Sequence, residues 1–102
     1  MQVRSVGRLE EFIARHADAA RWLRNWLAAA LDADWRSLQE VRKTFPHADG
    51  VKVKSGRTVT VFNVRGNKYR LIVTINYPTG IIIVGTMLTH AEYDKDQWKE
   101  TL

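Results

Sequence analysis

The chain of 102 residues is long enough for one compact domain and too short for two. It is 45% hydrophobic with four tryptophans, which argues against intrinsic disorder, and it contains no cysteine, which excludes disulfide bonds and cysteine-ligated zinc. The opening MQVRSVGRLEEF lacks the apolar run of a signal peptide, and no stretch approaches the ~20 apolar residues of a membrane span. We therefore expect a single domain over residues 1–102 of a cytoplasmic protein that does not contact a membrane.

The positive charge of the chain is concentrated in one segment. The formal net charge is +5, and residues 51–70 contain no acidic side chain. A basic patch on a small domain favours an anionic partner, most often nucleic acid, although a solvated charged surface is the alternative. The six basic residues of this segment are Lys52, Lys54, Arg57, Arg65, Lys68 and Arg70.

The first half of the chain predicts a short strand followed by helices. The opening MQVRSV alternates apolar and basic residues, and apolar residues recur with helical spacing from Leu9. Asp18 is the predicted N-cap of a second helix, and a third helical stretch follows Asp34 and ends at Pro46. Tryptophans at helical spacing are typical of a core facing a sheet, although an exposed one would suit a partner interface; they are Trp22, Trp26 and Trp35.

The second half predicts strands. Asp49-Gly50 is a predicted turn, after which the apolar spacing changes to two. Strands are expected over residues 57–64, 68–77 and 81–88, joined by short turns into an antiparallel meander. The last segment, HAEYDKDQWKETL, predicts a short C-terminal helix. The fold class is α+β, with N-terminal helices packed on one face of a small antiparallel sheet.

The predicted sheet determines which face each residue of the second strand occupies. In the second predicted strand, alternate residues beginning at Tyr69 share one face, and those beginning at Arg70 share the other. If the Tyr69 face meets the helices, Arg70 projects from an open face, where an extended polymer has room to lie.

The usual catalytic motifs are absent. The sequence has no phosphate-binding loop, dinucleotide fingerprint, zinc-protease motif or nucleophile elbow. The three histidines are too scattered along the chain to predict a local metal site. We therefore do not expect a metal enzyme.

Several side chains in and after the predicted strands are of the types that RNA cleavage requires. Metal-independent cleavage needs a group that takes the proton of a ribose 2′-OH, cations for the phosphate oxygens and an acid for the leaving oxygen. Arg70 is a permanent phosphate donor, and the meander brings it close to His90, which exchanges protons near neutral pH. The alternative interpretation of His90 is a solvated residue at the start of a helix. Tyr93 can stack on a base, or it can anchor the last helix. The simpler interpretation of the remaining polar residues is a solvated surface; they are Glu92, Asp94 and Lys95.

The sequence also resembles a known family. The segments FPHADGV, VFNVRGNKYRLIVTINY and MLTHAEYDKDQW, within residues 35–98, are similar to the HigB family of type II toxins, a branch of the RelE-like superfamily. This resemblance implies a RelE-like α+β toxin fold and an endoribonuclease that cuts mRNA on the ribosome without a cofactor. It also implies a HigA-like antitoxin with a helix-turn-helix domain, and contact with operator DNA only through the complex of the two proteins.

The resemblance further implies roles for individual residues. Arg70 matches the strand arginine that grips the scissile phosphate, and His90 and Tyr93 match positions that move protons or orient the substrate. Glu92 has three alternative roles: a base, a group that positions Arg70, or a helix cap. The predicted RNA-binding cations are Lys52, Lys54, Arg57, Arg65, Lys68 and Lys95.

Two other functions remain open at this point. A catalytically inert domain that binds RNA or the ribosome would use the same basic patch, because phosphate contacts supply affinity without chemistry. An interaction domain for an acidic protein would also use it.

Overall fold

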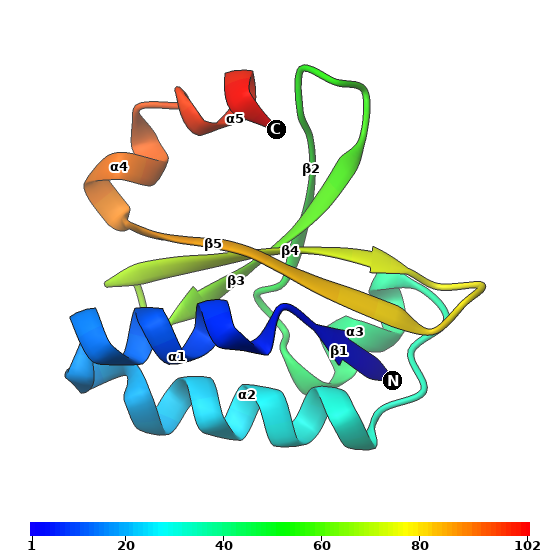
Figure 1. Ribbon diagram of the computed structural model, residues 1–102. Coiled ribbons are helices and arrows are strands. Elements are labelled where there is room, and N and C mark those ends of the chain that lie inside the picture. Colours follow the sequence, from blue (N-terminus) through cyan, green and yellow to red (C-terminus); the bar gives the residue numbers. More distant parts are fainter.

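The computed structural model describes all residues, 1–102 (Figure 1). The first half forms a short strand and three helices, with a 3₁₀ turn between the first two helices at Ala17–Ala19. These elements are β1 (Gln2–Arg4), α1 (Val6–Arg15), α2 (Ala20–Asp32) and α3 (Leu38–Thr44). The second half supplies four strands and two short helices, namely β2 (Asp49–Lys52), β3 (Thr58–Val64), β4 (Tyr69–Asn76), β5 (Ile81–Thr89), α4 (His90–Asp94) and α5 (Trp98–Thr101).

The strands form one sheet in the order β1-β5-β4-β3-β2. The predicted meander is confirmed as β3-β4-β5, and every pair is antiparallel except β1 with β5, which is parallel. The α+β class is therefore confirmed, with five strands where the meander alone predicted three. Strand β5 has a bulge at Gly85, because Ile72 pairs with Thr86 and Val73 with Val84. The residues of β4 continue to alternate between the two faces of the sheet.

The turn predicted at Asp49-Gly50 is wrong. Both residues begin β2, and Asp49 pairs with Val61 of β3. The chain reverses several residues later, where Gly56 adopts a positive φ of 90°. That conformation costs glycine little, so the tighter reversal forms there and leaves Asp49-Gly50 extended.

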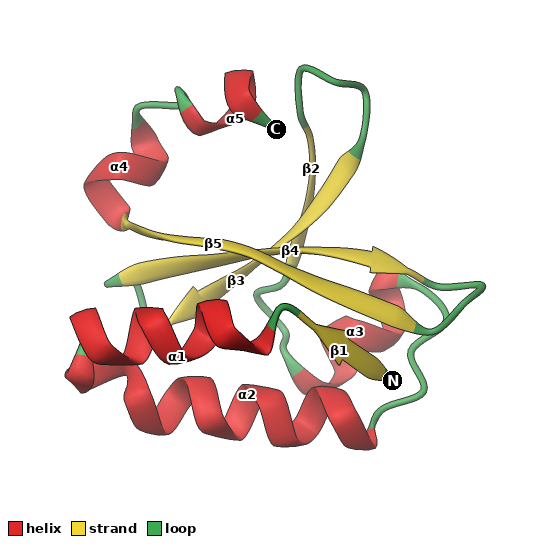
Figure 2. Ribbon diagram, viewed as in Figure 1, coloured by secondary structure: helices red, strands yellow, loops and turns green.

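The N-terminal helices cover one face of the sheet, as predicted (Figure 2). The main core joins α1 and α2 to the face of β4 that carries Tyr69, Leu71 and Val73. Trp26 is fully buried and meets the ring of Phe62 edge to face, with 5.6 Å between ring centroids. The predicted core role of the tryptophans is confirmed for Trp26 and Trp35, whereas Trp22 and its neighbour Phe45 are only partly buried.

Asp18 does not cap the second helix. It lies inside the 3₁₀ turn, and α2 begins at Ala20 without a side-chain cap. Its carboxylate faces the β3–β4 turn instead, where it accepts hydrogen bonds from Lys68 and Tyr69. Lys68 and Tyr69 thus occupy the carboxylate oxygens that an N-cap would offer to the amides of the helix.

The opposite face of the sheet is not open. The C-terminal residues form two short helices instead of the single one predicted, because Asp96 adopts a positive φ of 60° between them. In Figure 1 both helices lie on the side of the sheet away from α1 and α2. They close a second small core, whose buried residues are Val53, Val59, Val61, Ile72 and Trp98.

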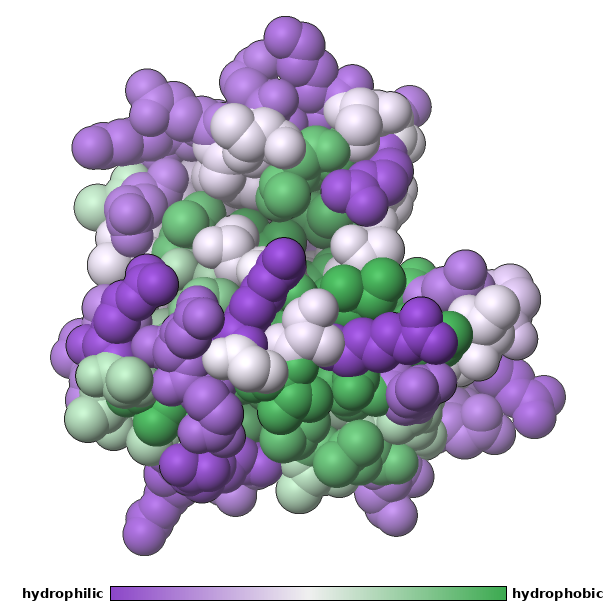
Figure 3. Space-filling model, viewed as in Figure 1, coloured by the Kyte–Doolittle hydropathy of each residue, from purple (hydrophilic) through white to green (hydrophobic).

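The surface reflects these two layers. In Figure 3, hydrophilic side chains cover the upper end, where Figure 1 places α5 and the turn after β2, and apolar surface is visible along the middle of the molecule. No helix is both long and apolar enough to cross a membrane.

Candidate functional site

Arg70 lies under the C-terminal segment, on the predicted face of the sheet but not exposed. Only 8% of the residue is accessible, because α4 and the β3–β4 turn enclose it. Its guanidinium donates to the Tyr69 carbonyl at 3.1 Å and to Oδ1 of Asn67 at 3.3 Å. Nη2 also lies 3.4 Å from Nδ1 of His90. The expected meeting of Arg70 and His90 therefore occurs, within hydrogen-bonding distance.

The position of His90 is set by the way β5 turns into α4. Thr89 caps the helix: its hydroxyl accepts from the Glu92 amide at 3.2 Å, and the Glu92 carboxylate accepts from the Thr89 amide at 2.9 Å. The His90 amide also donates to the Lys68 carbonyl at 3.1 Å, which ties α4 to the β3–β4 turn. His90 is therefore the first residue of a short helix whose start is fixed by the Thr89 cap and by the β3–β4 turn.

The two nitrogens of the His90 ring have different neighbours. Arg70 has only donors, so Nδ1 can accept its hydrogen bond only when that nitrogen carries a lone pair. Nε2 lies 3.2 Å from Oδ2 of Asp94, which favours the proton on Nε2. In the tautomer with its proton on Nε2, the ring therefore directs the lone pair of Nδ1 toward Arg70. Because 52% of the His90 side chain is exposed, the ring is also accessible to a substrate.

Tyr93 closes the site from above. The Arg70 guanidinium lies 5.5 Å from the centre of the Tyr93 ring, a cation–π distance. The Tyr93 ring also stacks on the Trp98 ring, with 5.1 Å between centroids, and the indole N–H donates to the Tyr93 carbonyl at 3.0 Å. Burial raises the pKa of the Tyr93 phenol, so its hydroxyl stays protonated and can donate. Tyr93 therefore both packs the last helix and contacts Arg70.

Glu92 is engaged as a helix cap. The hydrogen bond from the Thr89 amide, together with that from its hydroxyl, lowers the pKa of Glu92, so the carboxylate stays ionised. Of the three roles open to Glu92, capping is the one for which the structure shows the contacts.

The basic segment does not form a single patch. Arg65 and Lys68 turn toward the helices and pair with Asp18, with 3.3 Å between Nη1 of Arg65 and Oδ2 of the carboxylate. The Lys68 hydrogen bond is the main reason that the pKa of Asp18 is lowered to about 2. Lys54 pairs with Glu100 of α5 at 2.9 Å. The three candidate cations that are exposed and form no ion pair are Lys52, Arg57 and Lys95.

Sequence reasoning missed three contributors to this site. Asn67 accepts from Arg70, Asp94 contacts His90 and Trp98 supports Tyr93. The spacing of four residues between His90 and Asp94 on a predicted helix could have revealed the second contact. No group of three or more His, Cys, Asp or Glu side chains lies close enough together to hold a metal ion.

Comparison with known proteins identifies the family. Residues 19–96 match the model of the HigB toxin family, described as the RelE-like toxic component of a toxin-antitoxin system. The chain is also 30% identical, over 95 residues, to a protein of Escherichia coli O6:H1 named mRNA interferase HigB, covering 93% of this chain and 90% of the relative. The matched range contains Arg70, His90 and Tyr93. The chain therefore belongs to the HigB family of RelE-like toxins of toxin-antitoxin systems.

Proposed function

We propose that this toxin is a metal-independent endoribonuclease that cuts mRNA on the ribosome and so inhibits translation. The observation that carries the proposal is the contact of Arg70 with His90 beneath the Tyr93 ring. This contact brings together a permanent cation, a group that exchanges protons and an aromatic hydroxyl. The chain that contains it is related to an mRNA interferase.

Arg70 is proposed to hold the scissile phosphate. The 2′-oxygen attacks phosphorus while the bond to the 5′-oxygen breaks, and negative charge grows on the phosphate oxygens. A guanidinium fixed by Asn67 and the Tyr69 carbonyl is already oriented, and a site enclosed by protein strengthens its attraction for that charge. The Tyr93 hydroxyl is a second donor for the same group.

His90 is proposed to move the proton. When a phosphate oxygen takes the Arg70 hydrogen bond, Nδ1 is released and can accept the proton of the 2′-OH. The resulting imidazolium then donates a proton to the 5′-oxygen as it leaves. The products of this step are a 2′,3′-cyclic phosphate and a 5′-hydroxyl. Glu92 serves the step indirectly, by holding the start of α4.

The surrounding cations are proposed to guide the RNA backbone. Lys52, Arg57 and Lys95 are exposed and available for phosphates. Lys54, Arg65 and Lys68 would have to exchange a carboxylate partner for a phosphate, so their contribution is smaller.

The remaining partners follow from the family. We propose that residues 1–102 act as one toxin domain in the cytoplasm, without a cofactor. Its inhibitor would be a HigA-like antitoxin with a helix-turn-helix domain, and operator DNA would be contacted only through that complex.

The proposal is tested by substituting the two central residues. Arg70→Ala and His90→Ala should each reduce cleavage by at least about 100-fold, the usual cost of losing an electrostatic donor or an acid–base group. Growth of cells expressing each variant should recover, while circular dichroism shows an unchanged fold. Full toxicity in both variants would reject this site.

The inert-binder alternative makes a different prediction. A domain that only occupies the ribosome would stop growth without creating new RNA ends, and Arg70→Ala would then weaken binding and not cleavage. Mapping message ends after brief induction of the unaltered toxin separates the two functions.

A further inference from the structure

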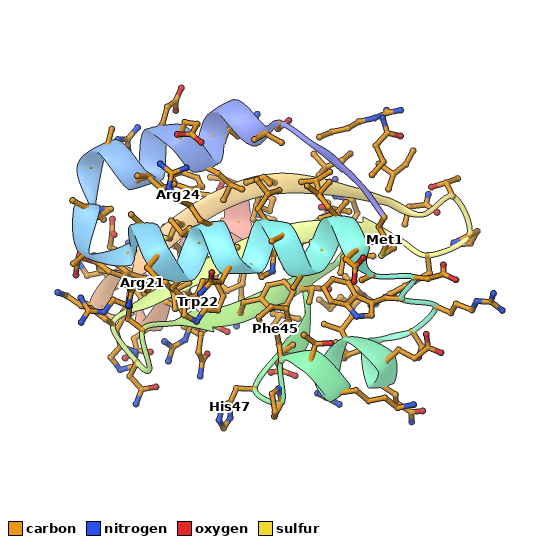
Figure 4. All side chains as sticks on the ribbon, turned by 90° about the horizontal axis from the view of Figure 1, so that it is seen from below. Met1, Arg21, Trp22, Arg24, Phe45 and His47 are labelled. Atoms are coloured by element: carbon orange, nitrogen blue, oxygen red, sulfur yellow. The ribbon has the colours of Figure 1, made fainter.

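A pocket of about 500 Å³ lies beside the Arg70 site and shares only Asn67 with the proposed step. It lies between α2, the segment that follows α3, and the end of β3. In Figure 4, Trp22 projects from α2 toward Phe45, and His47 stands further out at the margin of the molecule. The residues that line the pocket include Trp22, Phe45, His47, Phe62, Asn63 and Asn67.

The aromatic part of the pocket is held in place by packing. The rings of Trp22 and Phe45 have centroids 5.8 Å apart, and those of Phe45 and Phe62 are 5.3 Å apart. Phe62 is buried, whereas Trp22 and Phe45 are partly exposed. The pocket therefore offers flat aromatic surface to a ligand without prior rearrangement of the core.

The polar part of the pocket is continuous with the Arg70 site. Asn63 is the residue directly opposite Arg70 in the β3–β4 pair, so the two side chains share a face, with Cβ atoms about 5 Å apart. Asn67 lines the pocket and accepts the hydrogen bond from Arg70. Because β2 pairs with β3 only as far as Val61, the edge of β3 beside Asn63 is also free of a neighbouring strand.

We propose that this pocket binds one unstacked nucleobase of the RNA whose phosphate lies on Arg70. The inference rests on the proposed function for the identity of the polymer, and it assigns the pocket a role in base preference. Single-stranded RNA is read where bases leave the stack, lie against aromatic rings and hydrogen-bond through their edges. Asn63 and Asn67 offer amide donors and acceptors for such an edge, and His47 and Phe45 offer flat rings beside it. A nucleotide joined to the phosphate on Arg70 is the ligand that fits both parts at once.

Cleavage mapping provides the first test. RNA ends produced by the unaltered toxin should favour particular bases at one fixed position beside the cut. Asn63→Ala and His47→Ala should continue to cleave but lose that preference by roughly 5- to 150-fold, the range for one well-made base contact. Gln39→Ala is the matched control, because it removes an exposed amide from α3 outside the pocket and should keep the preference. Unchanged preference in both pocket variants would overturn the proposal.

Direct binding provides the second test and does not depend on cleavage. In NMR titrations with AMP, GMP, CMP and UMP, at least one nucleotide should shift the side-chain amide signals of Asn63 and Asn67 and the ring signals of His47. The amide of Gln39 should not move. If the pocket signals respond but the toxin creates no RNA ends, the proposed nuclease activity fails and the nucleobase site stands. If none of the four nucleotides shifts them, the site is refuted whatever the outcome of the cleavage experiments.

Discussion

Asp94 holds the outer side of the His90 ring, because its Oδ2 lies 3.2 Å from Nε2 one helical turn further on. In the tautomer that carries its proton on Nε2, that nitrogen can donate to the carboxylate while Nδ1 faces Arg70. Both side chains are more than half exposed, so solvent weakens the pair without removing its effect on ring orientation. In the proposed reaction Asp94 would thus be a positioning residue, since it would act through His90.

Replacement of Asp94 should slow cleavage less than loss of the ring. We expect Asp94→Asn to reduce the cleavage rate by about tenfold, because the amide can present its N–H to Nε2 and favour the wrong tautomer. Asp94→Glu should recover part of the loss. Asp96→Asn is the control: it removes the same charge from a position with positive φ, a conformation that asparagine tolerates. Equal rates for Asp94→Asn and Asp96→Asn would contradict this role.

The Asp18 carboxylate makes the stability of the fold depend on pH in the acidic range. Its pKa in the folded protein is lowered to about 2 from 3.8, chiefly by the hydrogen bond from Lys68. A lowered pKa means that the ionised carboxylate stabilises the fold above about pH 4, and this contribution is lost as the pH falls toward about 2. In Asp18→Asn, the melting temperature should be lower at pH 7 and should fall less between pH 4 and pH 2. A parallel decline in both proteins, followed by circular dichroism, would disprove the assignment.

Among the structural elements, the C-terminal pair α4–α5 connects stability to the site. Trp98 is 7% exposed, closes the second core and stacks on Tyr93. Removal of a buried tryptophan therefore affects both the packing of the sheet and the aromatic ring above Arg70.

Trp98→Ala should destabilise the protein by about 3–5 kcal/mol, the usual cost of deleting a large buried aromatic side chain. Trp98→Phe should retain most of the stability and activity, because a ring remains to stack on Tyr93. Urea unfolding measures the first effect, and growth inhibition by each variant measures the second. If Trp98→Ala unfolds at the same urea concentration as the unaltered toxin, the second core does not stabilise the fold.

The elements differ in how well local patterns predict them. Alternating apolar residues locate β3, β4 and β5, because period-two burial is a property of each strand by itself. The start of β2 at Asp49 was missed, since Asp-Gly favours a turn and only pairing with β3 makes it a strand. The covering of the second face was missed as well, because Trp98 stands alone in a polar segment and its partners are distant in sequence.

Local sequence patterns also predict the site only in part. The meander predicts that Arg70 and His90 meet, and the structure brings them within 3.4 Å. The burial of Arg70 under α4 depends on tertiary packing of the C-terminal segment, which no local pattern specifies. The pairing of Arg65 and Lys68 with Asp18 likewise depends on contacts between residues about 50 positions apart. Composition therefore located the cations correctly but could not show which of them are already paired.

At the scale of the whole molecule, the two layers separate structural from chemical roles. The helices bury one face of the sheet, and the opposite face carries Arg70 beneath a small C-terminal cover that supplies His90 and Tyr93. Of the candidate cations, Arg65 and Lys68 are paired with Asp18, whereas Lys52, Arg57 and Lys95 are exposed and form no ion pair. In the proposed function, long-range attraction of RNA would come from the whole charge, whereas cleavage would depend on the few groups enclosed at the site.

The most direct test of this account is selective sequencing of RNA 5′-hydroxyl ends after brief induction of the toxin. Attack by the 2′-oxygen leaves a 5′-hydroxyl, so the unaltered toxin should create new 5′-hydroxyl ends within translated messages. Arg70→Ala, expressed at the same level, should create at least about 100-fold fewer. New ends that carry only a 5′-phosphate, or undiminished 5′-hydroxyl ends in Arg70→Ala, would contradict cleavage by this site.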